Sequence, residues 1–251
     1  IRGFDIKYTN ISNHIAKKTY YYLINKNINN DDRINYITQT NVMKSKFKDF
    51  NIKFILYPTC KPIERTNSKI PSNKVNIVYT GTFRKEFMSL ELLTIIDELS
   101  KYDNFVITII ISKLYFIDDY KIKINELFKK LETKKNINIY HKLSYEKTIQ
   151  ILQTADYGFN LKNTSSDQKG EISTKIVEYI TYNIKPIINN SSDEIIFFNS
   201  NYPFLISNNQ CNTESLKQNI KKYKNHNIKD YINNSEFSKY SYENYKKTLS
   251  N

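Results

Sequence analysis

Between residues 75 and 206, short apolar segments alternate with segments of helical periodicity, and this alternation constrains the fold more strongly than any other feature of the sequence. The segment 105–111 is β-branched nearly throughout and apolar on both faces, as expected for a central strand of a parallel sheet. Alternating strands and helices predict βαβ units, so we expect a Rossmann-like α/β domain over residues 75–208. The expected strands cover residues 75–80, 105–111, 137–140, 157–161, 185–188 and 204–206, and the expected helices cover residues 88–101, 118–133, 144–154 and 173–183.

The segments that flank this domain are organised differently. Residues 1–58 predict two helices, at 12–26 and 40–49, and two short strands, at 34–37 and 53–57, which is too little chain to bury a sheet of its own. Residues 59–74 contain two prolines and several small polar residues, so we expect them to link two domains. Residues 209–251 predict exposed terminal helices near 213–224 and 236–249.

The chain carries 38 Lys and Arg against 25 Asp and Glu, a formal net charge of +13. Such a charge suits a nucleic acid, an anionic lipid surface or a phosphorylated ligand. A basic, Tyr-rich α/β protein that binds nucleic acid through charge and aromatic stacking is therefore one hypothesis. The lysines are scattered, however, and no motif of a known nucleic-acid reader occurs, so we expect no nucleic-acid partner.

Missing motifs exclude several other kinds of site. Two cysteines, Cys60 and Cys211, are too few for a disulfide framework, which fits a reducing cytoplasm. Three histidines without an H-E-x-x-H pattern or an acidic cluster predict no metal site. No G-x-S-x-G, P-loop or G-x-G-x-x-G pattern occurs. The longest apolar run, residues 106–111, is far shorter than the roughly 18 residues that a membrane helix requires.

The first candidate site follows the strand expected at residues 75–80, because open α/β sheets bind ligands at the carboxyl ends of their strands. Gly81 lets the backbone turn sharply and approach a ligand closely, with Thr82 beside it. Arg84 and Lys85 come next and are within reach of a bound phosphate. These residues alone allow phosphate binding, but a strand-ending glycine beside two solvated cations is the commoner explanation of such a pattern.

The second candidate site is the start of the helix expected at residues 173–183. Ser173 or Thr174 can cap this helix, whose free N–H groups and dipole favour an anion, and Lys175 adds a full positive charge. Glu178 lies one turn further on, where a carboxylate can accept hydrogen bonds from a ribose diol beside a bound diphosphate. The alternative is a capped helix with an exposed glutamate.

The order of these segments resembles the nucleotide-sugar-binding half of a GT-B glycosyltransferase, most of all the retaining family four, glycosyl transferases group 1. Three runs carry the resemblance: Ala-Asp-x-Gly at 155–158, Thr-Lys-x-x-Glu-Tyr at 174–179 and Pro-x-Ile at 186–188. Segments at 2–3, 36–44 and 55–60 resemble parts of the acceptor-side domain of these enzymes. The resemblance therefore implies that residues 1–58 are part of a second Rossmann domain, within which the chain begins.

The resemblance also implies roles for individual residues. Glu178 matches the glutamate that binds the donor ribose, and the first acid of the same motif falls on Gly170, beside Glu171. The implied catalytic residues are Arg84, Lys85 and Glu171. The implied donor-binding residues are Gly81, Thr82, Ile172, Ser173, Thr174, Lys175 and Glu178, with His141, Lys142 and Leu143 beside the nucleobase.

The implied activity is transfer of a sugar from a nucleotide-diphosphate donor to a glycan or lipid-linked acceptor in surface polysaccharide synthesis, with retention and without a metal or other cofactor. The implied location is the cytoplasm, at the inner face of the membrane, where the positive charge favours peripheral contact with anionic lipid. We expect this chain alone to bind donor with little or no transfer. A non-catalytic relative that acts as a subunit is the alternative, because the loop at Arg84 and Lys85 is irregular and the first acid is displaced.

Overall fold

The computed structural model describes residues 36–38, 54–56, 73–84, 87–114, 119–162, 172–207 and 213–240. The chain divides into two compact units, Ile1–Pro58 and Thr59–Asn251. In the first unit, β1 (Tyr36–Thr38) pairs in parallel with β2 (Phe54–Leu56), so both strands expected there are present. The helices expected at 12–26 and 40–49 lie outside the described residues.

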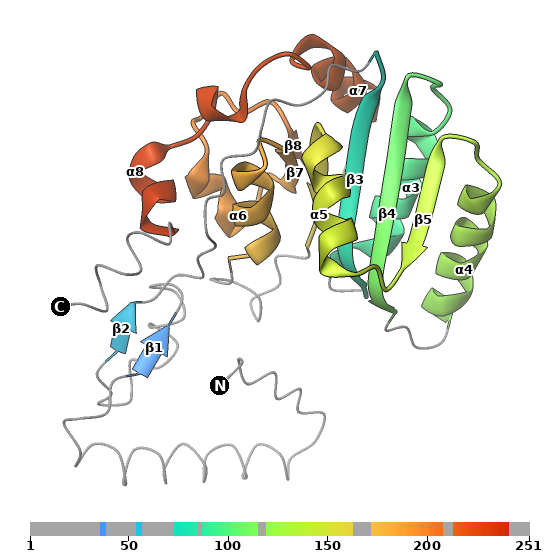
Figure 1. The fold of residues 1–251 in the computed structure, drawn as a ribbon, viewed down its shortest axis with the longest axis horizontal. Helices are drawn as coiled ribbons and strands as arrows, with labels where there is room; N and C mark the ends of the chain where they lie inside the picture. Colours follow the sequence, from blue (N-terminus) through green and yellow to red (C-terminus); the bar gives the residue numbers. More distant parts are fainter. Residues whose placement is uncertain are drawn as a thin grey trace, which may run out of the picture. The chain divides into compact units, whose positions relative to one another are not determined.

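The second unit contains a six-stranded parallel sheet, shown in Figure 1. Its strand order is β5-β4-β3-β6-β7-β8, so the chain runs outward from β3 to one edge and returns beside β3 to build the other half. This is the doubly wound order of a Rossmann-like α/β fold, which confirms the predicted fold class. The strands are β3 (Val75–Phe83), β4 (Phe105–Leu114), β5 (Ile137–His141), β6 (Tyr157–Asn160), β7 (Lys185–Asn189) and β8 (Leu205–Ile206).

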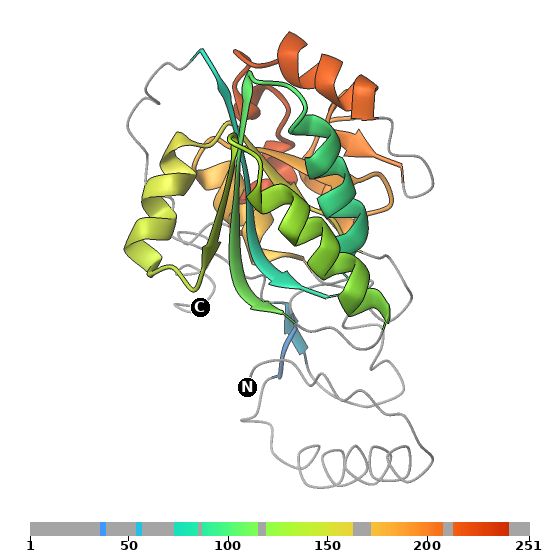
Figure 2. The ribbon, with the colours of Figure 1, turned by 90° about the vertical axis from the view of Figure 1, so that its right-hand side faces the viewer.

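Helices cover both faces of this sheet (Figures 1 and 2). One face packs against α3 (Ser89–Leu99), α4 (Asp119–Glu132) and α7 (Thr213–Lys222). The other face packs against α5 (Tyr145–Thr154) and residues of α6 (Thr174–Thr181). Because both faces are covered, the inner strands are apolar on both sides, which is the pattern that the sequence shows in 105–111.

β3 illustrates how alternate side chains serve the two faces. Ile77 and Tyr79 belong to the larger apolar cluster, which the helices α3 and α4 complete. Val78 points to the opposite face and packs in a smaller cluster with Leu152 of α5 and Tyr179 of α6. All three β3 side chains are at most 1% exposed, so β3 is the central strand of the domain.

The structure differs from the sequence-based expectations at three places. β3 and β4 continue beyond the predicted ends, to Phe83 and Leu114, through a bulge. A 3-10 helix, η3 (Asp193–Phe197), was not predicted. The helix α7 is not simply exposed, because Leu216 and Ile220 on one side of it are buried against the sheet domain.

The C-terminal part of the described chain is packed on one side only. The helix expected at 236–249 is represented by the short α8 (Asn234–Phe237) and a 3-10 turn, η5 (Ser238–Tyr240). Tyr240 is buried, and its ring lies 4.8 Å from that of Phe197. Aromatic contacts therefore tie Phe237 and Tyr240 to η3, while Ser238 and Lys239 are exposed as expected. Residues 241–249 of the expected helix lie outside the described residues.

The helix α6 lies so close to β6 at Gly158 that a larger residue at this position would clash with it. A Cβ atom at this position would lie 2.6 Å from Cε2 of Tyr179, whose ring is fully buried. We expect Gly158→Ala to lower the free energy of unfolding by about 1–3 kcal/mol, because a rigid ring must shift. Urea denaturation measures this loss. A double variant with Tyr179→Leu should lose less than the sum of the two single losses, whereas additive losses would contradict the clash.

Candidate functional site

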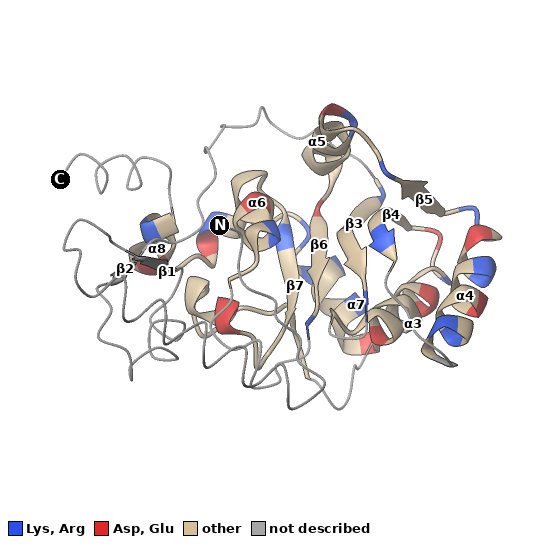
Figure 3. Ribbon diagram, turned by 90° about the horizontal axis from the view of Figure 1, so that it is seen from below, with Lys and Arg blue, Asp and Glu red and all other residues tan. Residues whose placement is uncertain are grey.

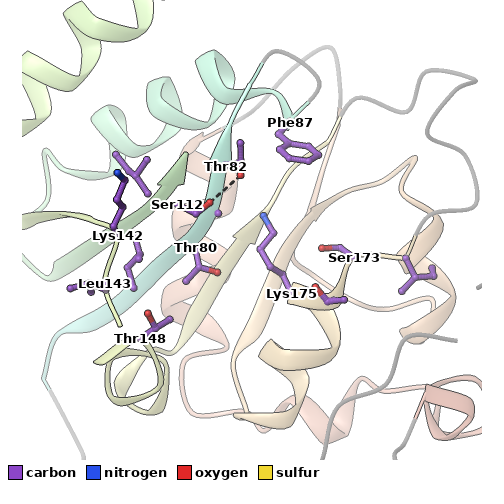
Figure 4. Close-up of a pocket in the computed structure, with 14 residues that line it drawn as sticks. Thr80, Thr82, Phe87, Ser112, Lys142, Leu143, Thr148, Ser173 and Lys175 are labelled. Atoms are coloured by element: carbon purple, nitrogen blue, oxygen red, sulfur yellow. Dashed lines mark hydrogen bonds between the residues drawn. The ribbon is translucent and has the colours of Figure 1, made fainter. Parts of the chain in front are cut away.

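A pocket of about 690 Å³ opens at the carboxyl ends of β3 and β4, beside the start of α6 and next to the point where the strand order reverses (Figure 4). Open α/β sheets bind their ligands at such points. We call it the switch-point pocket, and its walls come from β3, β4, the turn after β5, α5 and the start of α6. The residues that line it are Thr80, Gly81, Thr82, Phe87, Ile110, Ile111, Ser112, Lys142, Leu143, Thr148, Ile172, Ser173, Thr174 and Lys175.

The structure brings most of the predicted site residues together in this pocket. Eight of them line it: Gly81, Thr82, Lys142, Leu143, Ile172, Ser173, Thr174 and Lys175. The others are placed differently. His141 ends β5 with an exposed side chain and does not line the pocket, and neither does Glu178, which is half-buried on α6. Arg84 lies against Phe87, a lining residue, while Lys85 and Glu171 lie outside the described residues.

Gly81 is required where β3 passes the start of α6. Its φ of +146° lies in the region that side chains disfavour, and a Cβ atom there would lie 3.1 Å from the Lys175 ammonium nitrogen. Directly after Gly81 the register of β3 against β4 shifts, so that Thr82 pairs with Lys113 and Ser112 is the extra residue of a bulge. The hydroxyls of Thr82 and Ser112 lie 3.0 Å apart and both line the pocket.

The first turn of α6 presents its backbone to the pocket. Ser173 occupies the N-cap position, but its hydroxyl donates to Oδ1 of Asn160 and caps no helix N–H group, contrary to the expected capping role. Thr174 and Lys175 therefore begin the helix without a side-chain cap. Uncapped N–H groups and the helix dipole together form an anion-binding site.

Lys175 extends from this turn across the pocket toward Phe87 (Figure 4). Its ammonium nitrogen lies 4.7 Å from the ring centroid of Tyr79 and 5.7 Å from that of Phe87. Among the residues that the structure describes, none accepts a hydrogen bond from it or forms an ion pair with it. Burial lowers the pKa of the Lys175 ammonium to about 8, against the opposing influence of the Glu194 carboxylate. The pocket therefore holds a cation with which no carboxylate of the described residues is paired.

The other end of the pocket is mostly apolar. Lys142 adopts a left-handed conformation, with φ of +52°, and its N–H donates to the carbonyl of Ile111 at 3.0 Å. After this tight turn, Leu143 and Thr148 line the cavity together with Ile110, and Leu143 packs against the apolar cluster that contains Ile110. An apolar wall with a few polar groups is typical of the part of a cofactor or nucleotide site that holds a flat ring.

Behind the start of α6 lies a buried ion pair that the sequence-based reasoning did not find. The Glu194 carboxylate, in η3, is fully buried and pairs with the Lys162 ammonium at 2.9 Å. The same carboxylate accepts the N–H of Ser173 at 3.0 Å and the hydroxyl of Ser192. Glu194 thus fixes the backbone from which Thr174 and Lys175 enter the pocket.

Six lining residues were also missed: Thr80, Phe87, Ile110, Ile111, Ser112 and Thr148. Thr80, Ile110 and Ile111 could have been found, because they precede the ends of predicted strands in the sheet where ligands bind. Ser112 enters through the bulge, for which the sequence carries no signal. Glu194 could not be predicted as buried, because it lies in a polar segment of the sequence and its ion-pair partner, Lys162, is 32 residues away.

The described residues also bear on three other features: a metal site, a purely basic helix face and a membrane-spanning helix. Within the described parts of the chain, no three His, Cys, Asp or Glu side chains gather closely enough to hold a metal ion. Basic and acidic residues alternate along α4 (Figure 3), so the lysines of that helix are interspersed with carboxylates. None of the helices in the described ranges is long and apolar enough to cross a bilayer.

Comparison with solved structures identifies the architecture. The chain is similar to a glycosyltransferase from Rickettsia africae, with 18% identity and a TM-score of 0.57 over 86% of this chain and 57% of that one. It is also similar to the pneumococcal O-GlcNAc transferase GtfA, solved with UDP and GlcNAc, with 12% identity and a TM-score of 0.56 over 82% of this chain and 42% of that one. The fold is that of the GT-B glycosyltransferases.

A further GT-B protein extends the likeness beyond these two. The sucrose-phosphate synthase of Thermosynechococcus elongatus matches with 10% identity and a TM-score of 0.58, over 82% of this chain and 53% of that one. The chain therefore spans between 42% and 57% of the length of these three GT-B proteins. No protein-family model matches the sequence, and no curated protein matches it significantly.

The buried pair of Glu194 and Lys162 should be essential to the stability of this region. Glu194→Ala leaves the Lys162 ammonium, only 8% exposed, without its carboxylate, and it removes the acceptor of the Ser173 N–H. We expect a loss of about 3–5 kcal/mol in the free energy of unfolding, measured by urea denaturation. Glu98→Ala is the matched control, because its pair with Lys101 is exposed and should contribute less than about 1 kcal/mol. Equal losses for the two variants would contradict the assigned role.

Replacing Lys175 by Met should stabilise the protein at neutral pH. The folded state holds this ammonium with its pKa lowered to about 8, against an unfolded value of 10.5, so burying the charge costs free energy at every pH below 8. Between pH 8 and 10.5 the unfolded chain binds more protons, and this cost disappears as the pH rises. We expect Lys175→Met to gain about 1–3 kcal/mol at pH 7 and to lose that advantage by pH 10.5, as measured by urea denaturation. A gain that does not change with pH would contradict the lowered pKa.

Proposed function

We propose that this chain is the donor-binding part of a glycosyltransferase, and that the switch-point pocket holds a nucleotide-diphosphate sugar. The observation that carries the proposal is the Lys175 ammonium, which enters the pocket beside the uncapped start of α6 and has no carboxylate partner among the described residues. Removing a cation from water without a partner charge costs free energy. An anionic ligand that neutralises the Lys175 ammonium would explain why a lysine occupies this position.

The diphosphate lies at the start of α6 in this proposal. Its oxygens accept hydrogen bonds from the N–H groups of Thr174 and Lys175 and from the Lys175 ammonium. Arg84, at the end of β3, contributes a second positive charge near the diphosphate. The nucleobase occupies the apolar end between Leu143 and Ile110. Glu178, one turn into α6, is proposed to bind the ribose, and a nucleotide that extends beyond the pocket lining would reach it.

Catalysis in this proposal is electrostatic. As the bond from the sugar to the diphosphate breaks, negative charge grows on the leaving phosphate, and preorganised N–H groups and cations around it lower the barrier. Lys85 and Glu171 are proposed to act with Arg84 at this step. The protein's own cations supply the positive charge, so no metal or organic cofactor is proposed. Transfer with retention, in which the donor phosphate guides the acceptor, is part of the same proposal.

The proposed acceptor is a glycan or a lipid-linked sugar in surface polysaccharide synthesis, reached from the cytoplasm at the inner face of the membrane. Two neighbours support a glycan context. The pneumococcal O-GlcNAc transferase GtfA was solved with UDP and GlcNAc, and Staphylococcus aureus TarM, with 13% identity and a TM-score of 0.56, was solved with fondaparinux, α-GlcNAc-glycerol and UDP. The net charge of +13 favours contact with an anionic lipid surface, and a nucleic-acid partner is not proposed.

Thermal unfolding with nucleotides tests the donor site. A ligand at about 100 times its dissociation constant stabilises a protein by roughly 2.7 kcal/mol, which shifts the midpoint by several degrees. We expect one of UDP, GDP, ADP, CMP or dTDP to raise the midpoint of the unaltered chain. Lys175→Met should lose that shift although it is itself stable, and Lys129→Met on the exposed side of α4 should keep it.

Further measurements test the ribose contact of Glu178, nucleotide binding as a whole and the position of the bound nucleotide separately. Glu178→Gln should weaken nucleotide binding while leaving the binding of inorganic pyrophosphate unchanged, because only the ribose contact is lost. The absence of a shift with all five nucleotides, in a folded sample, would contradict the proposed function. A shift that survives Lys175→Met would place the nucleotide elsewhere on the chain.

A further inference from the structure

Hydrogen bonds connect Arg84, at the end of β3, with Phe87 and Ser89, at the start of α3. The Ser89 hydroxyl is fully buried, accepts the Arg84 N–H at 2.9 Å and donates to the Arg84 carbonyl at 2.8 Å. The Phe87 N–H donates to the same carbonyl at 3.0 Å, and Met88 takes a left-handed conformation that closes the turn. The position of the Phe87 ring is therefore set by backbone contacts on both sides.

This ring lies beside two cations, Lys175 of the pocket lining and the neighbouring Arg84. The Arg84 guanidinium carbon lies 4.0 Å from the ring centroid, and the Lys175 ammonium nitrogen lies 5.7 Å from it. The two cations come from different elements, the loop after β3 and the first turn of α6, and Phe87 is the ring that they share. Figure 4 shows the tip of Lys175 directed toward the Phe87 ring.

An aromatic face holds a cation without neutralising it. A carboxylate at the same place would also bind both side chains, but it would occupy their donors and cancel their charge. Among the described residues, none accepts a hydrogen bond from the buried Arg84 Nε, and no carboxylate forms an ion pair with the Lys175 ammonium. Two positively charged groups beside one aromatic ring match an anion with two charged centres.

We infer that Phe87 positions Arg84 and Lys175 as a pair, and that this pairing makes the pocket select a nucleoside diphosphate over the corresponding monophosphate. The inference rests on the proposed function and names a specificity-determining residue for it. Each phosphoryl group of a diphosphate meets one of the two cations, whereas a monophosphate uses only one. Phe87 touches the side chains and not the reacting atoms, so it is a positioning residue.

Isothermal titration of the full chain with UDP, UMP and inorganic pyrophosphate tests this inference, repeated with GDP and GMP if the guanine nucleotides bind better. We expect Phe87→Leu to lose about tenfold in affinity for the diphosphate and for pyrophosphate, and less than about twofold for the monophosphate. Phe87→Tyr retains the aromatic face and should keep the affinity of the unaltered chain. Tyr102→Leu is the matched control, because it removes a similar contact, with Lys217 at 4.0 Å, away from the pocket.

Each outcome decides between the inference and its rivals. Equal losses for diphosphate and monophosphate in Phe87→Leu, or a loss in Phe87→Tyr as large as in Phe87→Leu, overturn the inference, because the ring then acts through shape alone. Equal affinity of the unaltered chain for UDP and UMP overturns it even if Phe87→Leu does not fold. Failure of the unaltered chain to bind any nucleotide contradicts the proposed function itself.

Discussion

β3 pairs with β4 on one side and with β6 on the other, and the sheet grows outward from this strand in two directions. The chain must therefore leave β3 toward one edge and return beside it to build the other half of the sheet. The pocket lies next to this reversal, so its location is a consequence of strand order. Gly158 allows α6 to approach this part of the sheet closely enough to bring Lys175 over Gly81.

Burial stabilises the core beneath the pocket, whereas the polar groups at the pocket surface cost free energy. Tyr79, Phe83 and Phe128 pack edge to face below the pocket, where burial is favourable. Directly above them a lysine is desolvated beside aromatic rings, and a helix begins without a side-chain cap. The buried pair of Glu194 and Lys162 holds this costly arrangement in place from behind. Stability is concentrated beneath and behind the site, which leaves the polar groups of its surface available to a ligand.

Much of the second unit could be predicted because its strands and helices have clear hydrophobic periods, and the expected strands coincide with β3 to β8. Eight predicted site residues line the pocket because they follow strand ends or begin α6, positions that sequence order alone reveals. Features that depend on contacts between distant residues were not predictable. The β4 bulge at Ser112, the buried face of α7 and the Glu194 carboxylate each depend on a partner far along the chain.

The bulge at Ser112 also separates two mechanical roles of β4. Before it, every residue from Phe105 to Ile111 is held in step with β3 by the ladder of hydrogen bonds. Beyond it, Lys113 and Leu114 pair with Thr82 and Phe83 one position out of register, and both β4 side chains are exposed. Because Phe83 is buried in the core, β3 anchors this edge of the pocket, and the exposed end of β4 can change in sequence with little effect on core packing.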